Sequence, residues 1–424
     1  MSRVVQELST AAIVQAAARL EPVSFRTPVL PSERLSEALG ATVLLKREDI
    51  QVCRSYKMRG AFNLISSLTP EQRARGIVCA SAGNHAQGVA FACSHLGVRG
   101  RVFLPSTTPR QKRDRIKAIG GEWIEQVMIG HSYDQAGTAA LAEAQLTGAI
   151  YVHPFDDPRT IAGQGTVGLE INEQVGSNIS AVIVPVGGGG LIAGIAVWFR
   201  EHLPGVKIIG AEPAGASSML AALDNGAPIT LENLDTFVDG AAVGRVGELT
   251  FPIVRDLVDE IVAVPEGAIC TEMLGLYQSE GIIAEPAGAL ASAAARILHA
   301  AGKLPSIGEG VVVCIVSGGN NDVSRYSEII ERSLLHEGLR HYFLVTFPQE
   351  PGSLRYFLDK VLSNREDIVN FEYVKKNNRE TGPALVGIDL EAATDIEALL
   401  ARMRASPMQI ERIPAGSPLF AFLV

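Results

Sequence analysis

Residues 181–191 read AVIVPVGGGGL, an apolar strand pattern that runs directly into four consecutive glycines. Glycines between a strand and a helix leave backbone amides bare at the positive end of the helix dipole, where a phosphate group can bind. A structural turn alone needs only one or two glycines. The segment therefore predicts a phosphate-binding loop made of Gly187, Gly188, Gly189, Gly190 and Leu191.

On both sides of this loop, from about residue 42 to 330, short apolar runs alternate with helical patterns such as 57–68, 86–96 and 191–202. This alternation indicates βαβ units and parallel sheets that are buried on both faces. Ligands of such sheets bind beyond the carboxyl ends of the strands. The predicted strands are residues 42–48, 76–81, 101–105, 149–154, 181–186, 207–213 and 311–319.

The pattern changes near residue 330. A connecting helix at 331–340 is followed by an order of strands and helices that reads βαββαβ, which is typical of small ferredoxin-like, ligand-sensing modules. We expect two parallel-sheet α/β subdomains within 1–330, the smaller at about 52–152, then a connector at 331–337 and an α+β ferredoxin-like domain at 338–424. The predicted elements of this last domain are the strands 341–348, 368–376, 383–390 and 419–424 and the helices 350–362 and 395–403.

Composition narrows the classes of function. A formal net charge of −9 argues against a nucleic-acid partner, because phosphate backbones need a basic face. No apolar run reaches the length of about 18 residues that a membrane span requires, and the N-terminus lacks the pattern of a signal peptide. The five cysteines are dispersed without a CxxC pair, which argues against disulfides and a structural zinc site. We therefore expect a cytoplasmic protein.

Lys57 lies in SYKMRGA, residues 55–61, at the start of a predicted helix. A lysine in the first turn of a helix is usually a solvent-exposed residue. Beside a phosphate site the same amine can form a Schiff base with an aldehyde cofactor, especially where an apolar pocket lowers its pKa. This segment alone leaves both interpretations open.

Two further motifs follow predicted strands. In SAGNHAQG, residues 81–88, Asn84 can either cap the next helix or hydrogen-bond a substituent of a flat ligand. The turn amides can hold a carboxylate, so the candidate substrate contacts are Ser81, Ala82, Gly83 and His85. In SGGN, residues 317–320, Ser317 either belongs to a simple turn or faces a heteroaromatic nitrogen.

The glycine loop also fits a different class of enzyme. Gly188, Gly190 and Ala193 match the dinucleotide fingerprint GxGxxA, and Glu212 ends the next predicted strand, where a ribose-binding acid would lie. A nicotinamide-dependent dehydrogenase is therefore one alternative, although nothing else in the chain resembles a hydride-transfer site. A non-catalytic amino-acid sensor is a second alternative, against which the intact Lys57 argues.

Taken together and in their order along the chain, the motifs at 55–61, 81–88, 187–191 and 317–320 resemble the pyridoxal-5′-phosphate (PLP) enzymes of the tryptophan-synthase-β fold class, known as fold type II. The closest resemblance is to the biosynthetic threonine dehydratases, and it covers nearly the whole chain. It implies that Lys57 forms the Schiff base with PLP, Asn84 contacts the 3′-oxygen, residues 187–191 hold the phosphate and Ser317 meets the pyridine nitrogen. The C-terminal module, with EPGSL at 350–354, is similar to the ACT-like regulatory domain of this family.

The resemblance implies a lyase that converts L-threonine to 2-oxobutanoate and ammonia, the committed step of isoleucine biosynthesis. L-serine dehydration or another PLP-dependent β-elimination is the alternative within the class. It also implies a homo-oligomer, by analogy a tetramer, that isoleucine regulates, with valine as an opposing ligand.

Two departures from related enzymes qualify this interpretation. Ala82 stands where serine racemases carry a serine that acts as an acid, which disfavours racemisation. Ser218 stands where cation-binding relatives carry an aspartate near the counterpart of Glu212, so a cation near Glu212 stays an open question and we assign no metal ligand. Glu285, before Pro286, is expected to cap a helix, and a place near the substrate amine is the alternative.

Overall fold

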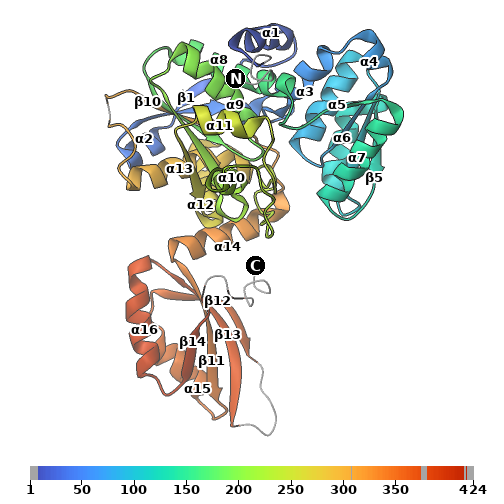
Figure 1. Cartoon of the computed structure of the whole chain (residues 1–424). Helices are drawn as coiled ribbons and strands as arrows, with labels where there is room; N and C mark the ends of the chain where they lie inside the picture. The colour runs from blue at the N-terminus through green and yellow to red at the C-terminus, as the bar shows by residue number, and fades with distance from the viewer. Residues whose placement is uncertain (1–7, 307, 374–379, 415–416, 418–424) are drawn as a thin grey trace. The chain divides into compact units, whose positions relative to one another are not determined.

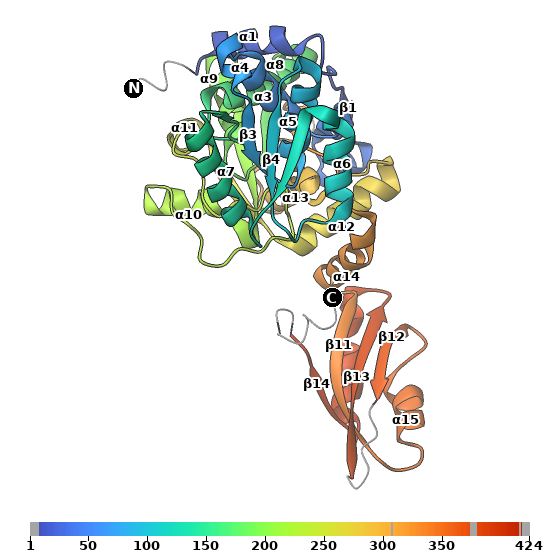
Figure 2. The same ribbon diagram turned by 90° about the vertical axis from the view of Figure 1, so that its right-hand side faces the viewer.

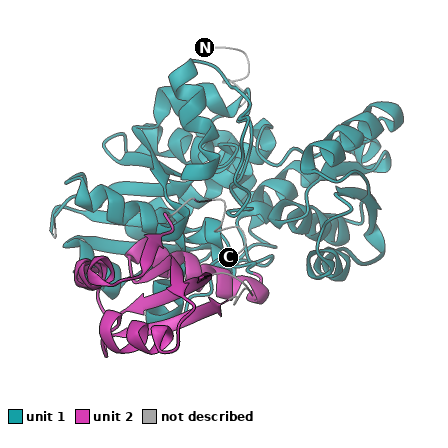
Figure 3. Cartoon of the chain, turned by 90° about the horizontal axis from the view of Figure 1, so that it is seen from below, with its two compact units in different colours: residues 1–321 teal, residues 322–424 magenta. Residues whose placement is uncertain are grey.

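A computed structural model describes residues 8–306, 308–373, 380–414 and 417 of the chain. The chain forms two compact units, residues 1–321 and 322–424, which Figure 3 distinguishes by colour. Each unit has hydrophobic clusters of its own. Among the described helices, none is both long enough and apolar enough to cross a membrane.

The larger sheet of the first unit contains β1 (Val29–Pro31), β2 (Thr42–Arg47), β7 (Ile179–Pro185), β8 (Lys207–Pro213), β9 (Glu260–Val264) and β10 (Val311–Val316). Their order is β1-β2-β10-β7-β8-β9, and every neighbouring pair is parallel except β1 and β2 (Figure 1). The four strands β2, β7, β8 and β10 lie where apolar runs predict them, because a sheet covered on both faces buries both sides of its inner strands.

The smaller sheet of this unit contains β3 (Ile77–Ala80), β4 (Gly100–Leu104), β5 (Ile124–Met128) and β6 (Ile150–Tyr151). All of its pairs are parallel, in the order β5-β4-β3-β6 (Figures 1 and 2). The strands β5 and β9 are missing from the sequence-based prediction. Both lie at a sheet edge. The strand β5 mixes polar with apolar residues and so produces no apolar run, whereas β9 contains the short apolar run 261–264, which the prediction omits.

Helices cover both sheets and begin at the strand ends that form the site. The helix bounds in this unit are α1 (Thr10–Leu20), α2 (Glu33–Leu39), α3 (Lys57–Ser66), α4 (Pro70–Ala74), α5 (Asn84–Leu96), α6 (Arg110–Gly120), α7 (Tyr133–Thr147), α8 (Pro158–Val175), α9 (Gly190–His202), α10 (Ser218–Asn225), α11 (Thr250–Leu257), α12 (Glu266–Glu280) and α13 (Pro286–Ala300). The helices α3, α5 and α9 begin within the lysine motif, the SAGNHAQG motif and the glycine loop. The helix α13 adjoins the SGGN motif.

The second unit begins with α14 (Tyr326–Glu337) and continues as β11 (Arg340–Pro348), α15 (Ser353–Tyr356), β12 (Glu366–Tyr373), β13 (Thr381–Leu390), α16 (Ile396–Ala405) and β14 (Gln409–Arg412). Its antiparallel sheet has the order β12-β13-β11-β14 and realises the predicted βαββαβ sequence (Figure 1). The fourth strand is β14, whereas the predicted strand 419–424 lies outside the described residues. The predicted helix 350–362 begins only at Ser353, since Gly352 before it has a left-handed φ of +98°.

Candidate active site

Lys57 is the first residue of α3, and its side chain is half-buried in the protein. Its Nζ atom donates a hydrogen bond to the carbonyl oxygen of Pro154 over 3.1 Å. Burial lowers the pKa of the Lys57 amine to about 8, against the opposing effect of the Glu285 carboxylate. A lysine with this pKa holds a useful fraction of the neutral, nucleophilic amine near physiological pH.

The glycine loop connects β7 to α9 and lies beside Phe155, the residue that follows Pro154. Gly189 has a left-handed φ of +91° and precedes α9, and no side chain caps the amides at the start of that helix. A Cβ atom at Gly188 would lie 2.3 Å from the Phe155 ring, and one at Gly190 would lie 3.0 Å from Phe155. The loop therefore presents backbone amides close to the Lys57 site and tolerates no side chain at Gly188 or Gly190.

Asn84 is the first residue of α5, and Gly83 takes the capping position without a side-chain hydrogen bond. The idea that Asn84 caps this helix is therefore wrong. Its Nδ2 atom donates to Glu285 Oε1 at 2.6 Å, and its Oδ1 atom accepts from Asn320 Nδ2 at 2.7 Å. The side chain thus contacts the segment after β10 and the residue that precedes α13.

Glu285 occupies the capping position of α13, as the sequence predicts, but its side chain makes no capping hydrogen bond. The carboxyl group is 5% exposed, and a Cβ atom at Gly318 would lie 2.2 Å from its Oε1 atom. Burial raises the pKa of Glu285 to about 7, and the charge of Asp239 acts in the same direction. The sequence singles out Glu285 as a helix cap or a neighbour of the substrate amine, but it does not reveal the bond with Asn84, which joins residues 201 positions apart.

Ser317 follows β10 and is 2% exposed. Its hydroxyl donates to the carbonyl of Ala287 at 3.1 Å, and its own carbonyl accepts from the Tyr56 amide at 3.2 Å. Ser55 forms an isolated β-bridge with Gly318. The SGGN motif and the lysine motif therefore adjoin, although about 260 residues separate them in the chain.

The four candidate substrate contacts differ in what they can offer. The Ser81 hydroxyl accepts from the Gly83 amide at 3.2 Å, and Ala82 offers only a methyl group. His85 is buried, its Nε2 atom lies 2.8 Å from the Val152 carbonyl, and burial lowers the pKa of its ring to about 3. A neutral ring that donates through Nε2 leaves Nδ1 as an acceptor, and this atom has no protein partner among the described residues.

Glu212 is the penultimate residue of β8. Its carboxylate accepts hydrogen bonds from the amides of Met219 and Leu220 at 2.7 and 2.9 Å and so caps α10. Within the described parts of the chain, no group of three or more His, Cys, Asp or Glu residues is arranged to hold a metal ion. These contacts account for Glu212 without a ribose or a cation.

A buried charge network supports α3 from behind. Arg59, two residues after Lys57, donates to Glu48 at 2.8 Å and to Glu170 at 2.6 Å, and Lys46 donates to Glu170 at 2.6 Å. Arg59, Lys46 and Glu48 are fully buried. The network joins β2, α3 and α8, and so it holds the start of α3, which carries Lys57, in place against these two elements.

These features fit an anionic aromatic aldehyde such as PLP. The aldehyde would meet the half-buried Lys57 amine, and its phosphate would meet the uncapped amides at the start of α9. The buried Ser55 hydroxyl has no hydrogen-bond partner in the described protein, as is the case for His85 Nδ1. Such unpaired polar atoms are costly unless a ligand or solvent pairs with them.

Comparisons with known proteins agree with this chemistry. Residues 20–318 match the pyridoxal-phosphate dependent enzyme family, and residues 331–423 match the C-terminal regulatory domain of threonine dehydratase. The chain is 56% identical to the biosynthetic L-threonine dehydratase of Mycobacterium bovis, over 98% of this chain and 96% of the relative. The chain belongs to the biosynthetic L-threonine dehydratases. The threonine dehydratase of Corynebacterium glutamicum is 54% identical over 98% of this chain and 96% of its own.

Solved structures support the same family assignment for this threonine dehydratase. The processed form of threonine deaminase isoform 2 from Solanum lycopersicum superposes with a TM-score of 0.72 at 41% identity, covering 76% of this chain and 93% of that one. Maize serine racemase superposes with a TM-score of 0.70 at 35% identity, covering 78% of this chain and 99% of that one.

Family membership confirms three predictions from the sequence: the fold class, PLP as the cofactor and a lyase of the threonine dehydratase type. It also confirms a regulatory domain at the C-terminus. The dehydrogenase alternative is wrong, since the glycine loop lies within the PLP-dependent part of this threonine dehydratase.

Proposed function

We propose that this threonine dehydratase converts L-threonine to 2-oxobutanoate and ammonia, the committed step of isoleucine biosynthesis, at the site around Lys57. The observation that carries the proposal is the position of the half-buried Lys57 amine. It donates a hydrogen bond to the carbonyl of Pro154, and the next residue, Phe155, packs against the glycine loop. Its relatives, of which two are 56% and 54% identical, are named for L-threonine as substrate.

Four elements would hold the cofactor. Lys57 would bind its aldehyde carbon, residues 187–191 its phosphate, Asn84 its ring oxygen and Ser317 its ring nitrogen. When bound, PLP supplies an electron sink for the charge that develops at the substrate α-carbon. Ser317 offers a hydroxyl instead of a carboxylate, so it stabilises a protonated ring nitrogen less than an aspartate would.

The protein positions the substrate and moves its proton. The neutral Lys57 amine can take the α-proton, because burial lowers its pKa to about 8. The amides of the 81–84 turn, at the start of α5, would hold the substrate carboxylate. Ala82 provides no acid that could return a proton to the opposite face, which favours elimination over racemisation.

The test compares Lys57→Ala with Lys117→Ala, which changes an exposed lysine of α6. Only the Lys57 variant should lose the visible absorbance of the bound cofactor and nearly all production of 2-oxobutanoate from threonine. If the parent protein stays colourless when PLP is added, the proposed function is wrong. A yellow and active Lys57→Ala protein would refute the role of Lys57.

L-serine dehydration is the second activity to measure. A pocket discriminates one substrate methyl group by only about 1–3 kcal/mol, so serine should also react. We expect a larger kcat/KM for threonine than for serine. The opposite order would make the protein a serine dehydratase with the same machinery.

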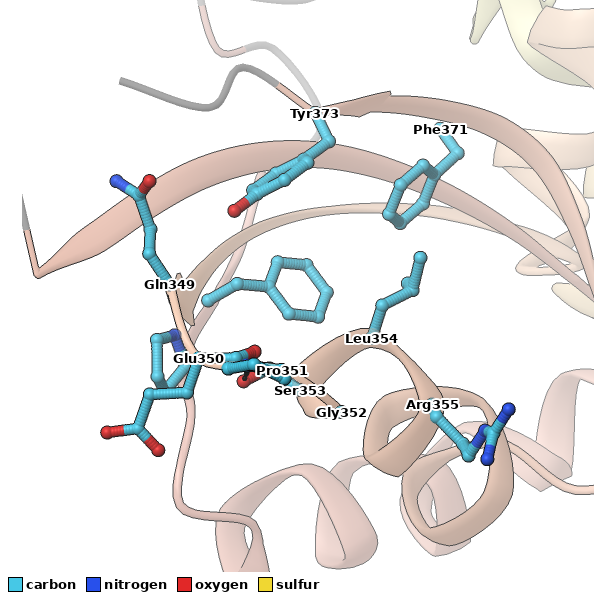
Figure 4. Close-up of a pocket in the computed structure, with 11 residues that line it drawn as sticks. Gln349, Glu350, Pro351, Gly352, Ser353, Leu354, Arg355, Phe371 and Tyr373 are labelled. Atoms are coloured by element: carbon cyan, nitrogen blue, oxygen red, sulfur yellow. Dashed lines mark hydrogen bonds between the residues drawn. The ribbon is translucent and has the colours of Figure 1, made fainter. Parts of the chain in front are cut away.

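We further propose that isoleucine, opposed by valine, binds the regulatory unit. A cavity of about 620 Å³ lies between the end of β11, the start of α15 and β12. Phe371 and Tyr373 project from β12 toward Leu354 (Figure 4), and their ring centroids lie 6.1 and 5.7 Å from that of Phe347. The walls therefore suit a branched aliphatic side chain. Such an effector acts only if it binds two conformational states with different affinity.

A matched pair of leucines tests this site. Leu354 lines the cavity, Leu358 does not, and both are 44% exposed. Leu354→Asp should weaken isoleucine inhibition at sub-saturating threonine, whereas Leu358→Asp should leave it unchanged. Equal effects of the two changes would place the effector elsewhere.

The assembly and the compartment complete the proposal. We propose a cytoplasmic homo-tetramer, in which regulatory units of two chains pair. The five cysteines are buried, and none of them forms a disulfide in the described parts of the chain, as a reducing compartment allows. Light scattering of the purified protein, with and without isoleucine, measures the assembly directly.

A further inference from the structure

Asn320, the last residue of the SGGN motif, connects three segments of the site. Its Nδ2 atom donates to the backbone carbonyl of Cys53 at 2.8 Å and to Asn84 Oδ1 at 2.7 Å. Asn84 in turn donates through Nδ2 to Glu285 Oε1 at 2.6 Å. The result is a one-way chain of hydrogen bonds from Asn320 through Asn84 to Glu285.

The direction of this chain follows from its first member. A backbone carbonyl can only accept, so the Cys53 oxygen requires the NH₂ group of Asn320. The second N–H of that group then requires the oxygen of Asn84, which turns the nitrogen of Asn84 toward the Glu285 carboxylate. The opposite orientation of Asn84 would set donor against donor at Asn320 and acceptor against acceptor at Glu285.

We propose that Asn320 is a positioning residue that orients the Asn84 amide so that it offers a ligand an N–H donor. One N–H of Asn84 binds Glu285, and the other is left to meet a ligand oxygen that accepts. This inference rests on the proposed function, in which Asn84 contacts the ring oxygen of PLP. An oriented donor stabilises the deprotonated form of that oxygen over the hydroxyl form.

The experiment reverses the polarity of Asn320 in the full-length holoenzyme. Asn320→Asp keeps the size of the side chain but replaces the donor with acceptors, so Asn84 must turn its nitrogen toward position 320. Asn320→Ala removes the anchor without adding charge. Asn321→Asp places the same charge one residue further along, where the parent side chain contacts the Ala284 carbonyl instead of Asn84.

The readouts are the visible absorption band of the bound cofactor and the cofactor dissociation constant. Both Asn320 variants should move the band to shorter wavelength, and Asn320→Asp should weaken cofactor binding by about tenfold, the effect of one lost hydrogen bond. Asn321→Asp should leave both values unchanged. In an Asn84→Ala background, Asn320→Asp should shift the band no further, because Asn320 acts through Asn84.

The outcomes separate this inference from the proposed function. A parent protein without a Lys57-dependent visible band overturns the proposed function itself. A parent with that band, combined with Asn320 variants whose band and cofactor affinity match the parent, overturns the inference alone. If Asn320→Asp does not fold, Asn320→Ala decides, since an unchanged band in that variant contradicts the positioning role.

Discussion

The ring of Phe155 packs so closely against Gly188 that a Cβ atom at position 188 would lie 2.3 Å from the ring carbons. The carbonyl of Pro154, the preceding residue, accepts the hydrogen bond from Lys57. A glycine at position 188 therefore allows the phosphate-binding loop to lie next to the segment whose Pro154 carbonyl binds Lys57.

Replacing Gly188 with alanine should displace Phe155 and weaken cofactor binding by about tenfold, since overpacking of this kind costs about 1–3 kcal/mol. Equilibrium titration with PLP measures the effect. Gly137→Ala is the control, because a Cβ there meets nothing within 4 Å. Adding Phe155→Ala to Gly188→Ala should restore part of the affinity; if it restores none, the added methyl group acts on the phosphate rather than on Phe155.

The raised pKa of Glu285 makes stability depend on pH. Burial raises this pKa from an ordinary 4.5 to about 7, so between these values the folded state holds a proton that the unfolded state releases. The contribution of Glu285 to the free energy of unfolding therefore falls as pH rises through this window. Glu285→Gln does not titrate, so its free energy of unfolding relative to the parent should rise from about pH 5 to pH 7 and then level off.

Denaturant titrations of both proteins at several pH values measure this difference. Glu232→Gln, at an exposed position, is the control and should show no such slope. A difference between Glu285→Gln and the parent that stays constant with pH would show that Glu285 ionises with an ordinary pKa.

Arg59→Met should destabilise the protein by about 3–5 kcal/mol, because it leaves two buried carboxylates, Glu48 and Glu170, without their main partner. The matched control is Arg26→Met, which breaks an ion pair with Glu173 whose side chains are 57% and 50% exposed. That change should cost less than about 1 kcal/mol. Chemical denaturation measures both, and similar losses would mean that the buried network adds no more than a surface pair.

The residue at which the chain is shortened to remove the regulatory unit should affect the solubility and the heat stability of the remaining protein. Glu331 on α14 accepts hydrogen bonds from Arg340 and from the Tyr342 hydroxyl, both on β11. A chain that ends at Glu337 keeps α14 but loses β11, whereas a chain that ends at Asn321 removes the whole second unit. Both should lose the response to isoleucine, and the chain ending at Asn321 should be the more soluble and the more heat-stable of the two.

Activity assays, thermal melting and light scattering compare the two shortened chains. If both behave alike, an α14 that has lost β11 does not lower the solubility or the stability of the shortened chain. If the chain ending at Asn321 keeps isoleucine inhibition, the effector site lies outside the second unit.

Local pattern accounts for much of what could be predicted here. An apolar run that ends in glycine or serine before a helix marks a strand end in a parallel sheet, and Asn84, the glycine loop and Ser317 occupy such places, whereas Lys57 begins α3 beyond the turn Glu48–Ile50. The strand β5 escaped prediction because it mixes polar with apolar residues, and β9 escaped it although residues 261–264 form a short apolar run.

The sequence by itself determined which segments become strands and helices, since the spacing of apolar residues reports burial along each element. It also determined the family, because four motifs occur in a characteristic order. Only the tertiary structure decided which side chains meet: Asn84 with Glu285 and Asn320, Phe155 with Gly188, and Lys57 with the Pro154 carbonyl. These pairs lie on different elements, and their contact depends on how helices and sheets pack in three dimensions, which periodicity within one segment does not encode.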